Sequence, residues 1–250
     1  MTYDCFTFFN ELDLLEIRLN ILDPYVDYFV LAECEETFSG KEKPLFFLEN
    51  EEKRFNKWKD KILWLENPKI KTDAPFERAG FQKDNLRKFL KEIAKDEDII
   101  YFGDLDEIWK PQDIKDDKVY NLRQLNYSYY LNNRSSEEWV GTIVGKWKTI
   151  KTNSFNYWRA NHHNILDNGG WHFTNMGGEA QILKKLDAYD HQEANIPAVR
   201  QGIKFRMDNG LDYLGREADW KGKPFTFRKD ESELPQYLLK NKVKYDKMFM

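Results

Sequence analysis

Short apolar runs alternate with helix-like segments through the first part of the chain, and this alternation most narrows the possible folds. The runs span residues 3–9, 28–32, 62–65 and 99–102. Between the first two, leucine and isoleucine recur at near-helical spacing until Pro24 ends the element. Strands separated by helices favour a parallel sheet with right-handed crossovers. We therefore predict an α/β fold with a mainly parallel central sheet flanked by helices.

Size and charge restrict the class of protein. The chain has 250 residues, of which 41% are hydrophobic, so it can bury a full core and we expect one domain over residues 1–250. It carries 39 basic and 43 acidic residues, a formal net charge of -4. Because no positive field attracts a polyanion, we expect no nucleic-acid partner. The 8 Trp, 13 Tyr and 18 Phe either pack in the core or stack on sugar rings, and composition leaves both readings open.

The ends of the chain and the cysteines bear on location. No apolar run approaches the roughly 20 residues of a membrane helix, and the first residues carry no export signal, so we expect no transmembrane segment and a cytoplasmic protein. Residues 240–250 mix lysines with apolar side chains. They indicate a docking helix or a tail with weak membrane-surface association, and docking is favoured. We expect Cys5 and Cys34 to be buried thiols, because their spacing is typical of neither metal sites nor redox motifs.

The strongest local motif is a pair of acids directly after an apolar run. Residues 99–102 lead into Gly103, and Asp104 and Asp106 follow with one residue between them. Both carboxylates then lie at the carboxyl end of a strand, where parallel sheets bind ligands. Hard oxygen donors at this place suit Mn²⁺ or Mg²⁺, which can bridge phosphate oxygens. The alternative is that the acids belong to an ordinary strand-end turn or helix cap.

A helix over residues 78–94 is predicted to carry one apolar and one polar face. Arg78, Gln82 and Asn85 share the polar face at helical spacing. That face lines a ligand crevice or is simply solvated.

A second constellation is rich in glycine. Paired glycines at 169–170 and 177–178 flank Trp171 and His172, and Glu179 follows at the start of a helix-like segment. Glycines allow the backbone to approach a ligand closely. The alternatives are a first-turn acid favoured by the helix dipole for Glu179, and ordinary hydrogen-bonded histidines for His172 and for His191 beyond the helix.

In this order, the motifs resemble glycosyltransferase family 17. The resemblance covers residues 3–192 and is carried by residues 3–19, 26–33 and 37–41, by the polar face at 78–85, by the acids at 104–108 and by the glycine-flanked segment through to His191. It implies a GT-A-like fold, a UDP-sugar donor with UDP-N-acetylglucosamine first, a glycan acceptor, Mn²⁺ or Mg²⁺, and inversion at the anomeric carbon. It divides the domain into a nucleotide-sugar-binding half, residues 1–110, and an acceptor-binding and catalytic half, residues 111–250.

The resemblance also implies roles for single residues. It assigns Asp106 to direct metal contact and Asp104 to contact through water or ribose, with His191 or His172 as a further ligand. Glu179 is the expected general base for the acceptor hydroxyl, and His172 is the second choice. The expected donor-binding residues are Asn10 and Glu11 near the uridine, Glu33 at the ribose, and Arg78, Gln82, Asn85, Asp104 and Trp171.

Two other classes of protein remain as alternatives. A haloacid-dehalogenase-type phosphatase also places two spaced acids after a buried strand, but there the motif opens the domain and continues with Thr or Val, whereas Glu107 and Ile108 follow here. A non-catalytic carbohydrate-binding protein would account for the aromatic residues. Metal-dependent release of UDP distinguishes a transferase from such a binding protein.

Overall fold

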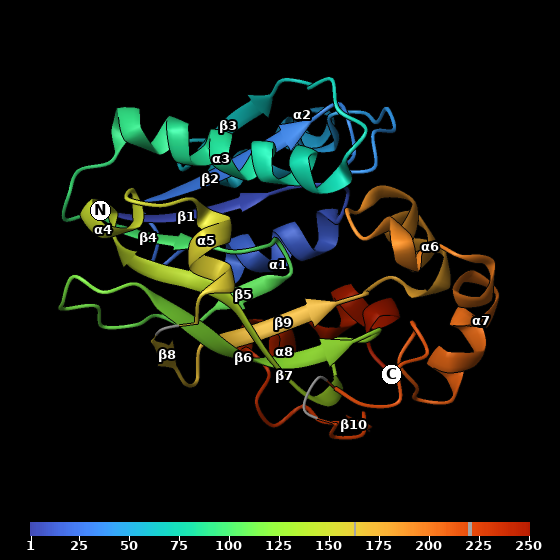
Figure 1. Ribbon diagram of the computed structural model, residues 1–250. Coiled ribbons are helices and arrows are strands. Elements are labelled where there is room, and N and C mark those ends of the chain that lie inside the picture. Colours follow the sequence, from blue (N-terminus) through green and yellow to red (C-terminus); the bar gives the residue numbers. More distant parts are fainter. Residues whose placement is uncertain (163, 220–221) are drawn as a thin grey trace.

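The computed structural model describes residues 1–162, 164–219 and 222–250 (Figure 1). In these residues one sheet has the strand order β3-β2-β1-β4-β7-β6-β9-β5, with β10 paired to β7 and β8 paired to β6. The strands are β1 Thr2–Thr7, β2 Tyr28–Cys34, β3 Ile62–Asn67, β4 Ile99–Phe102, β5 Glu107–Trp109, β6 Tyr120–Ser128, β7 Asn133–Lys146, β8 Ile165–Leu166, β9 Gly170–Thr174 and β10 Phe227–Lys229.

Helices of several kinds connect and cover these strands. The α-helices are α1 Leu12–Leu22, α2 Phe46–Asn50, α3 Pro75–Ile93, α4 Trp147–Ile150, α5 Phe155–Ala160, α6 Gly178–Ala188, α7 Pro197–Asp208 and α8 Gln236–Lys240. A π-helical turn, η1 Glu51–Phe55, and three 3₁₀ segments, η2 Asn56–Trp58, η3 Gln192–Ala194 and η4 Lys242–Met248, complete the described elements.

The first half of the sheet is parallel, as predicted. β1 pairs in parallel with both β2 and β4, and β2 pairs in parallel with β3. Side chains of β1 alternate between two apolar cores, with Cys5 in the core under α3 and Phe6 in the core under α1. Apolar packing on both faces, almost complete in β1, β2 and β4 and partial in β3, explains why these strands appear as apolar runs. Cys5 and Cys34 are free buried thiols, which confirms the prediction for both.

The second half of the sheet is different, and the prediction of a mainly parallel sheet is wrong. β7 pairs antiparallel with both β4 and β6, and β5 pairs antiparallel with β9. Only residues 129–132 connect β6 to β7, and a link this short makes a hairpin because a parallel crossover needs a dozen residues or more. The sheet is therefore mixed.

Helices cover both faces of the parallel half. α3 begins with Pro75 at its first turn, and its Leu86 and Leu90 are fully buried in the core that it shares with α5. There the rings of Phe102 and Phe155 stack with centroids 4.0 Å apart. On the other face, α1 packs against α8 and the end of the chain. Figure 1 shows α6 and α7 beside the ends of β1 and β9.

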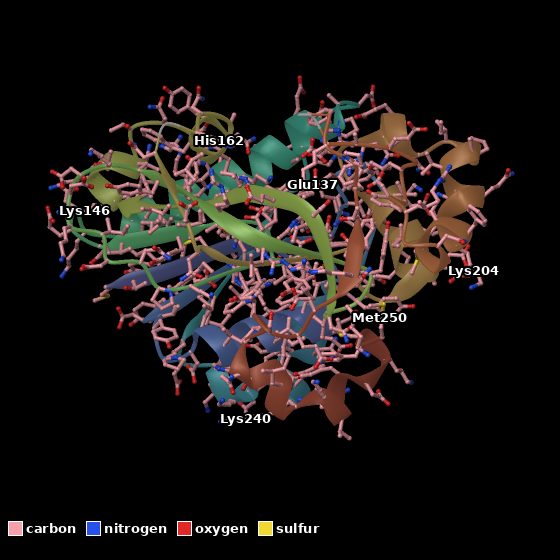
Figure 2. All side chains as sticks on the ribbon, turned by 90° about the horizontal axis from the view of Figure 1, so that it is seen from below. Glu137, Lys146, His162, Lys204, Lys240 and Met250 are labelled. Atoms are coloured by element: carbon pink, nitrogen blue, oxygen red, sulfur yellow. The ribbon has the colours of Figure 1, made fainter. Side chains whose placement is uncertain are left out.

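The C-terminal segment docks onto the body of the protein, which confirms the favoured prediction. Tyr245 and Met248 are buried in the core under α1, and Lys244 forms an ion pair with Glu16 of α1. Figure 2 shows Lys240 at the end of α8, the helix that packs against α1. No helix among the described residues is long and apolar enough to cross a membrane.

Candidate active site

The main cavity opens at the carboxyl ends of β1, β2 and β4 and extends along β6, β7 and β9. It has a volume of about 480 Å³, within the range of small-molecule sites. Its remaining walls come from helices α3, α5 and α6, from β10 and from the loops after β2, α6 and α7. Its polar lining includes Glu11, Gln82, Lys83, Asp104, Asp106, Glu137, Arg159, His172, Lys185, Asp190, His191 and Asp212.

A buried arginine holds the acidic loop at one edge of this cavity. Arg18 of α1 donates to both carboxylate oxygens of Asp4 on β1, at 2.8 and 2.6 Å. The same guanidinium donates to the backbone carbonyls of Asp104, Leu105 and Glu107 at 2.8–3.0 Å. Both partners of the pair are fully buried. Arg18 therefore links the first strand to the loop that carries the two acids.

Asp104 faces two cationic side chains. Arg159 of α5 lies 2.9 Å from its Oδ2, and Lys83 of α3 lies 3.4 Å from its Oδ1. Burial alone would raise the pKa of Asp104, but the charges of Arg159 and Lys83 outweigh it and lower the pKa to about 2. The carboxylate is therefore ionised and surrounded by positive charge.

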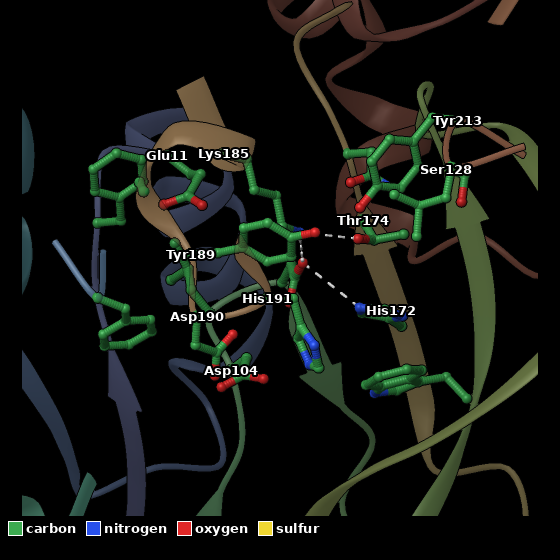
Figure 3. Close-up of a pocket in the computed structure, with 18 of the residues that line it drawn as sticks. Glu11, Asp104, Ser128, His172, Thr174, Lys185, Tyr189, Asp190, His191 and Tyr213 are labelled. Carbon is green, nitrogen blue, oxygen red and sulfur yellow. Dashed lines mark hydrogen bonds and ion pairs between the residues drawn. The ribbon is translucent and has the colours of Figure 1, made fainter. Parts of the chain in front are cut away.

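Asp106 has a similar environment built from other elements. Its Oδ2 lies 3.5 Å from Lys185 Nζ of α6 and 3.6 Å from His172 Nε2 of β9. Burial opposes ionisation here too, yet Lys185 and His172 lower the pKa of Asp106. Lys185 also donates to Thr174 at 3.1 Å. Figure 3 shows Lys185, Thr174 and His172 converging on this part of the cavity.

Glu107 anchors the wall behind the two aspartates. It is fully buried and accepts two hydrogen bonds from Arg159, at 3.0 and 2.8 Å, one from Trp139 at 2.7 Å and one from Thr142 at 2.9 Å. A Cβ at Gly141 would overlap the Glu107 carboxylate, so glycine is required there. Glu107 thus fixes the positions of Arg159 and Trp139.

Trp139 in turn supports the histidine. Its ring stacks on His172 with centroids 4.3 Å apart and planes 24° from parallel. His172 is buried on β9, and its Nδ1 has no hydrogen-bond partner among the described residues. The ring is held by stacking, with Nε2 toward Asp106.

The glycine-rich segment is mostly strand, and its glycines have local packing reasons. Gly170 begins β9 with φ 121°, and a Cβ there would overlap the backbone of Ile108 on β5. Gly177 precedes α6 with φ 90°, a conformation that L side chains rarely adopt. These glycines let β9 pair closely and α6 turn toward the cavity.

The structure brings together half of the residues predicted for the site. Six of them line the main cavity: Glu11, Gln82, Asp104, Asp106, His172 and His191. His191 sits at its edge, where Nδ1 lies 2.6 Å from Glu193 and the ring meets Phe76 edge-on at 4.8 Å. His172, not His191, is the imidazole beside Asp106.

The remaining predicted residues do not line the main cavity. Glu33 is fully buried and pairs with Lys43 at 3.1 Å, which places that lysine in the cavity wall. Arg78 donates to the carbonyl of Phe38 at 2.7 Å and so shapes the loop after β2. The others are engaged elsewhere: Asn10 with Gln181, Asn85 with Asn67, Trp171 with the carbonyl of Glu233, and Glu179 in the first turn of α6.

Several lining residues were missed by the sequence analysis. Lys83 and Lys185 come from helices, Arg159 from a short helix, and Glu137 and Trp139 from β7. Lys83 follows Gln82 directly, so the polar face of α3 was a signal for it. The sequence of β7 contained no such signal for Glu137 and Trp139, and that of α6 contained none for Lys185.

The two aspartates and the imidazole beside Asp106 are suitable ligands for a divalent cation. Two ionised carboxylates face one cavity, and an imidazole nitrogen lies beside one of them, which are ligands that Mn²⁺ and Mg²⁺ accept. The described residues contain no group of three or more acidic, His or Cys side chains that could hold a metal by themselves. The residues therefore fit a cation whose remaining ligands come from a substrate, as phosphates do for Mg²⁺.

Comparison with known proteins identifies the family of the chain. A family model, glycosyltransferase family 17, matches residues 1–201. The protein is thus an enzyme that transfers a sugar from a donor to an acceptor. The chain belongs to glycosyltransferase family 17, which confirms the resemblance seen in its motifs and favours sugar transfer over the phosphatase and non-catalytic alternatives. No curated protein matches the chain.

Proposed function

We propose that this enzyme transfers a sugar, with N-acetylglucosamine as the first candidate, from a UDP-sugar to a glycan with inversion. The observation that carries the proposal is the pair Asp104 and Asp106, ionised in one cavity and surrounded by Lys83, Arg159 and Lys185. Positive side chains and a carboxylate-bound cation both favour a diphosphate. The parallel order β3-β2-β1-β4, with the acids after β4, supports a GT-A-like donor site.

The nucleoside fits the end of the cavity at β1, β2 and α3. Phe9 and Phe38 line this end together with Lys43 and Gln82. Aromatic faces can stack on a uracil ring, and an amide such as that of Gln82 can pair with its carbonyl and imide groups. Glu11 lines the same cavity and interacts electrostatically with Lys185. Burial raises the pKa of Glu11 despite the hydrogen bond from Asn10 N at 3.0 Å.

A divalent cation fits beside Asp106, with His172 and Asp104 as the neighbouring ligands. When bound, it would neutralise charge on the departing diphosphate. The chain's own residues bind the diphosphate and position the groups around it. Lys185 and Arg159 hold the diphosphate oxygens, Trp139 fixes the orientation of His172, and Arg18 keeps the acidic loop in register with β1.

Glu137 is the carboxylate best suited to act as general base. Glu179, predicted for this role, does not line the cavity, whereas Glu137 does. Burial raises the pKa of Glu137, against the lowering effect of Arg216, and a raised pKa makes a carboxylate a better proton acceptor near neutral pH. Its side chain is 19% exposed. Glu137 takes the proton of the acceptor hydroxyl, the new oxygen–carbon bond forms at the anomeric carbon, and the carbon–oxygen bond to the diphosphate breaks with its electron pair leaving on UDP.

Calorimetric titration of UDP with and without Mn²⁺ tests the proposal. Wild-type protein should bind UDP more tightly with the metal, and Asp106→Asn should lose that metal-dependent gain because the amide carries no charge. Asp113→Asn is the matched control, since Asp113 is exposed and lies outside both the cavity and the acidic loop. UDP release from UDP-N-acetylglucosamine should follow the same pattern. Full affinity and turnover in Asp106→Asn, or tighter binding of GDP or CMP than of UDP, would contradict the assignment.

A further inference from the structure

A second cavity adjoins the first along β6 and β7. It also has a volume of about 480 Å³, and its walls come from β6, β7, β10 and the segment between β8 and β9. Asn126, Ser135 and Glu137 line both cavities. Glu137, labelled on β7 in Figure 2, therefore stands where the two meet. None of the acids and cations at the diphosphate position lines the second cavity.

An irregularity in strand pairing produces this junction. Leu125 of β6 pairs with Glu138 of β7, but Tyr127 pairs with Arg134. The three residues 135–137 thus face the single residue Asn126. Such bulges break the ladder and redirect side chains, and they are common beside active sites. Here the bulge turns Glu137 toward both cavities.

The second cavity contains buried amide groups without protein partners. Gln124 is 1% exposed, and neither its Oε1 nor its Nε2 has a hydrogen-bond partner among the described residues. Asn126 is 3% exposed, and its Oδ1 is likewise unpaired, while its Nδ2 donates to Glu137 at 3.4 Å. Unpaired buried polar groups destabilise a fold, so their presence points to a ligand. Two amides supply both donors and acceptors, as sugar hydroxyls require.

The charges around these amides are already balanced. Arg123 pairs with Asp167 and with Glu138, the latter at 3.5 Å. Arg134 and Arg228 both pair with Asp230, at 3.3 and 3.0 Å. Every arginine that lines this cavity therefore has a carboxylate partner. Among the described residues of its lining, the unpaired buried polar atoms are those of the amides Gln124 and Asn126, which suit an uncharged, hydroxyl-rich ligand.

We infer that the second cavity binds an uncharged sugar residue of the acceptor glycan, held by Gln124 and Asn126. This inference rests on the proposed function, because it takes the donor diphosphate to lie at Asp104 and Asp106. The acceptor sugar then reaches the main cavity at Glu137 with its reactive hydroxyl toward the donor. The donor sugar is the other possible source of hydroxyls. It would require the diphosphate to lie beside Gln124, away from Asp104, Asp106 and Lys185, none of which lines the second cavity.

An array of neutral and sialylated oligosaccharides, probed with labelled protein in the presence of UDP and Mn²⁺, tests this site. Wild-type protein should bind neutral oligosaccharides. Gln124→Leu removes the amide, and Thr226→Trp places a large ring at the exposed mouth of the cavity. Each should weaken glycan binding about tenfold or more, the loss expected for about 1.4 kcal/mol of contact. The matched controls are Gln112→Leu and Lys223→Trp, which lie outside both cavities and should bind as wild type.

Two further measurements separate the possible outcomes. UDP affinity should be the same in Gln124→Leu as in wild type, and its melting temperature should be equal or higher, because the change removes an unpaired buried amide. Absence of glycan binding by a wild-type protein that binds UDP overturns this inference and leaves the proposed function standing. Binding of sialylated oligosaccharides alone, or equal binding by all variants, also overturns it. Failure of wild type to bind UDP refutes the proposed function itself.

Discussion

Removal of the buried Arg18 guanidinium should destabilise the fold and the acidic loop together. Met has a similar length and is apolar, so Arg18→Met keeps most of the volume and deletes every donor. Asp4 would keep only the hydrogen bond from Trp109 Nε1, at 2.8 Å, and its charge would stay fully buried. Three backbone carbonyls of the loop would also lose their donor.

Breaking one side of a buried ion pair costs about 3–5 kcal/mol. For a domain of this size, about 2–4 °C of melting temperature is lost per kcal/mol, so the melting temperature of Arg18→Met should fall by roughly 6–20 °C. The double variant Asp4→Leu, Arg18→Met removes the stranded charge as well. Stability should therefore return in part, because apolar replacement of a whole buried pair is often neutral.

In the double variant, UDP affinity should not recover together with stability. The double variant still lacks the donor that holds the carbonyls of Asp104 and Leu105, so its metal-dependent UDP affinity should remain as weak as in the single variant. Urea denaturation followed by circular dichroism gives the stability, and calorimetry gives the affinity. The reasoning is refuted if Arg18→Met stays within about 1 kcal/mol of wild type, the range of an ordinary substitution, or if the double variant regains UDP affinity along with stability.

Three further changes probe the site. Glu107→Gln should lower the free energy of unfolding by about 1.5–3 kcal/mol, because Arg159 loses its fully buried carboxylate partner and keeps only Asp104 among the described residues. Urea denaturation measures this, and a near-normal value would contradict it. The direction of the pH dependence follows from the burial of Glu137. Because burial raises its pKa, the carboxylate takes up a proton at a higher pH than an exposed glutamate does. The value of kcat/KM should therefore fall as the pH drops through that raised pKa. Glu137→Gln should lack this limb and lose about 10²–10⁴-fold in rate, and a retained limb would assign it to another group. Lys185→Met should weaken UDP binding about 10–100-fold if a charge-assisted hydrogen bond of about 1.5–3 kcal/mol is lost, and calorimetry with unchanged affinity would remove Lys185 from the diphosphate position.

The parallel half of the fold was predictable because its strands pack against apolar cores on both faces, almost completely in β1, β2 and β4 and partly in β3, and therefore appear as apolar runs. The strand β7, Asn133–Lys146, was not predictable, because its first six residues are all polar and apolar residues appear only from Trp139 on. Residues 145–150 have a β-like sequence, yet they form the end of β7 and the helix α4. Local pattern cannot reveal that such a strand inserts beside β4, since that choice depends on partners far along the chain.

The same limit applies to the site. Asp104 and Asp106 could be found because a strand end is a local feature. Glu179 and Lys185 illustrate what could not be found from the sequence. Both lie on α6, but they are six residues apart, and at about 100° per residue they lie on different faces of the helix. Only Lys185 reaches the cavity. Which face turns inward is set by the packing of α6 against α7. Arg159 and Glu137 likewise depend on where the second half of the sheet lies.

The position of β4 between β1 and β7 has a consequence for dividing this chain. A break after residue 110 falls between the two halves inferred from the sequence, yet it would separate β4 from β7, with which it pairs over Ile99 to Phe102. The fragment 1–110 would present the unpaired N–H and C=O groups of a short apolar strand, which is a template for self-association. It would also lack Arg159 and Lys185, the cations that offset its two acids. Residues 1–110 are therefore not a transplantable module, and exchange of parts between such enzymes has to carry β7 along with β4.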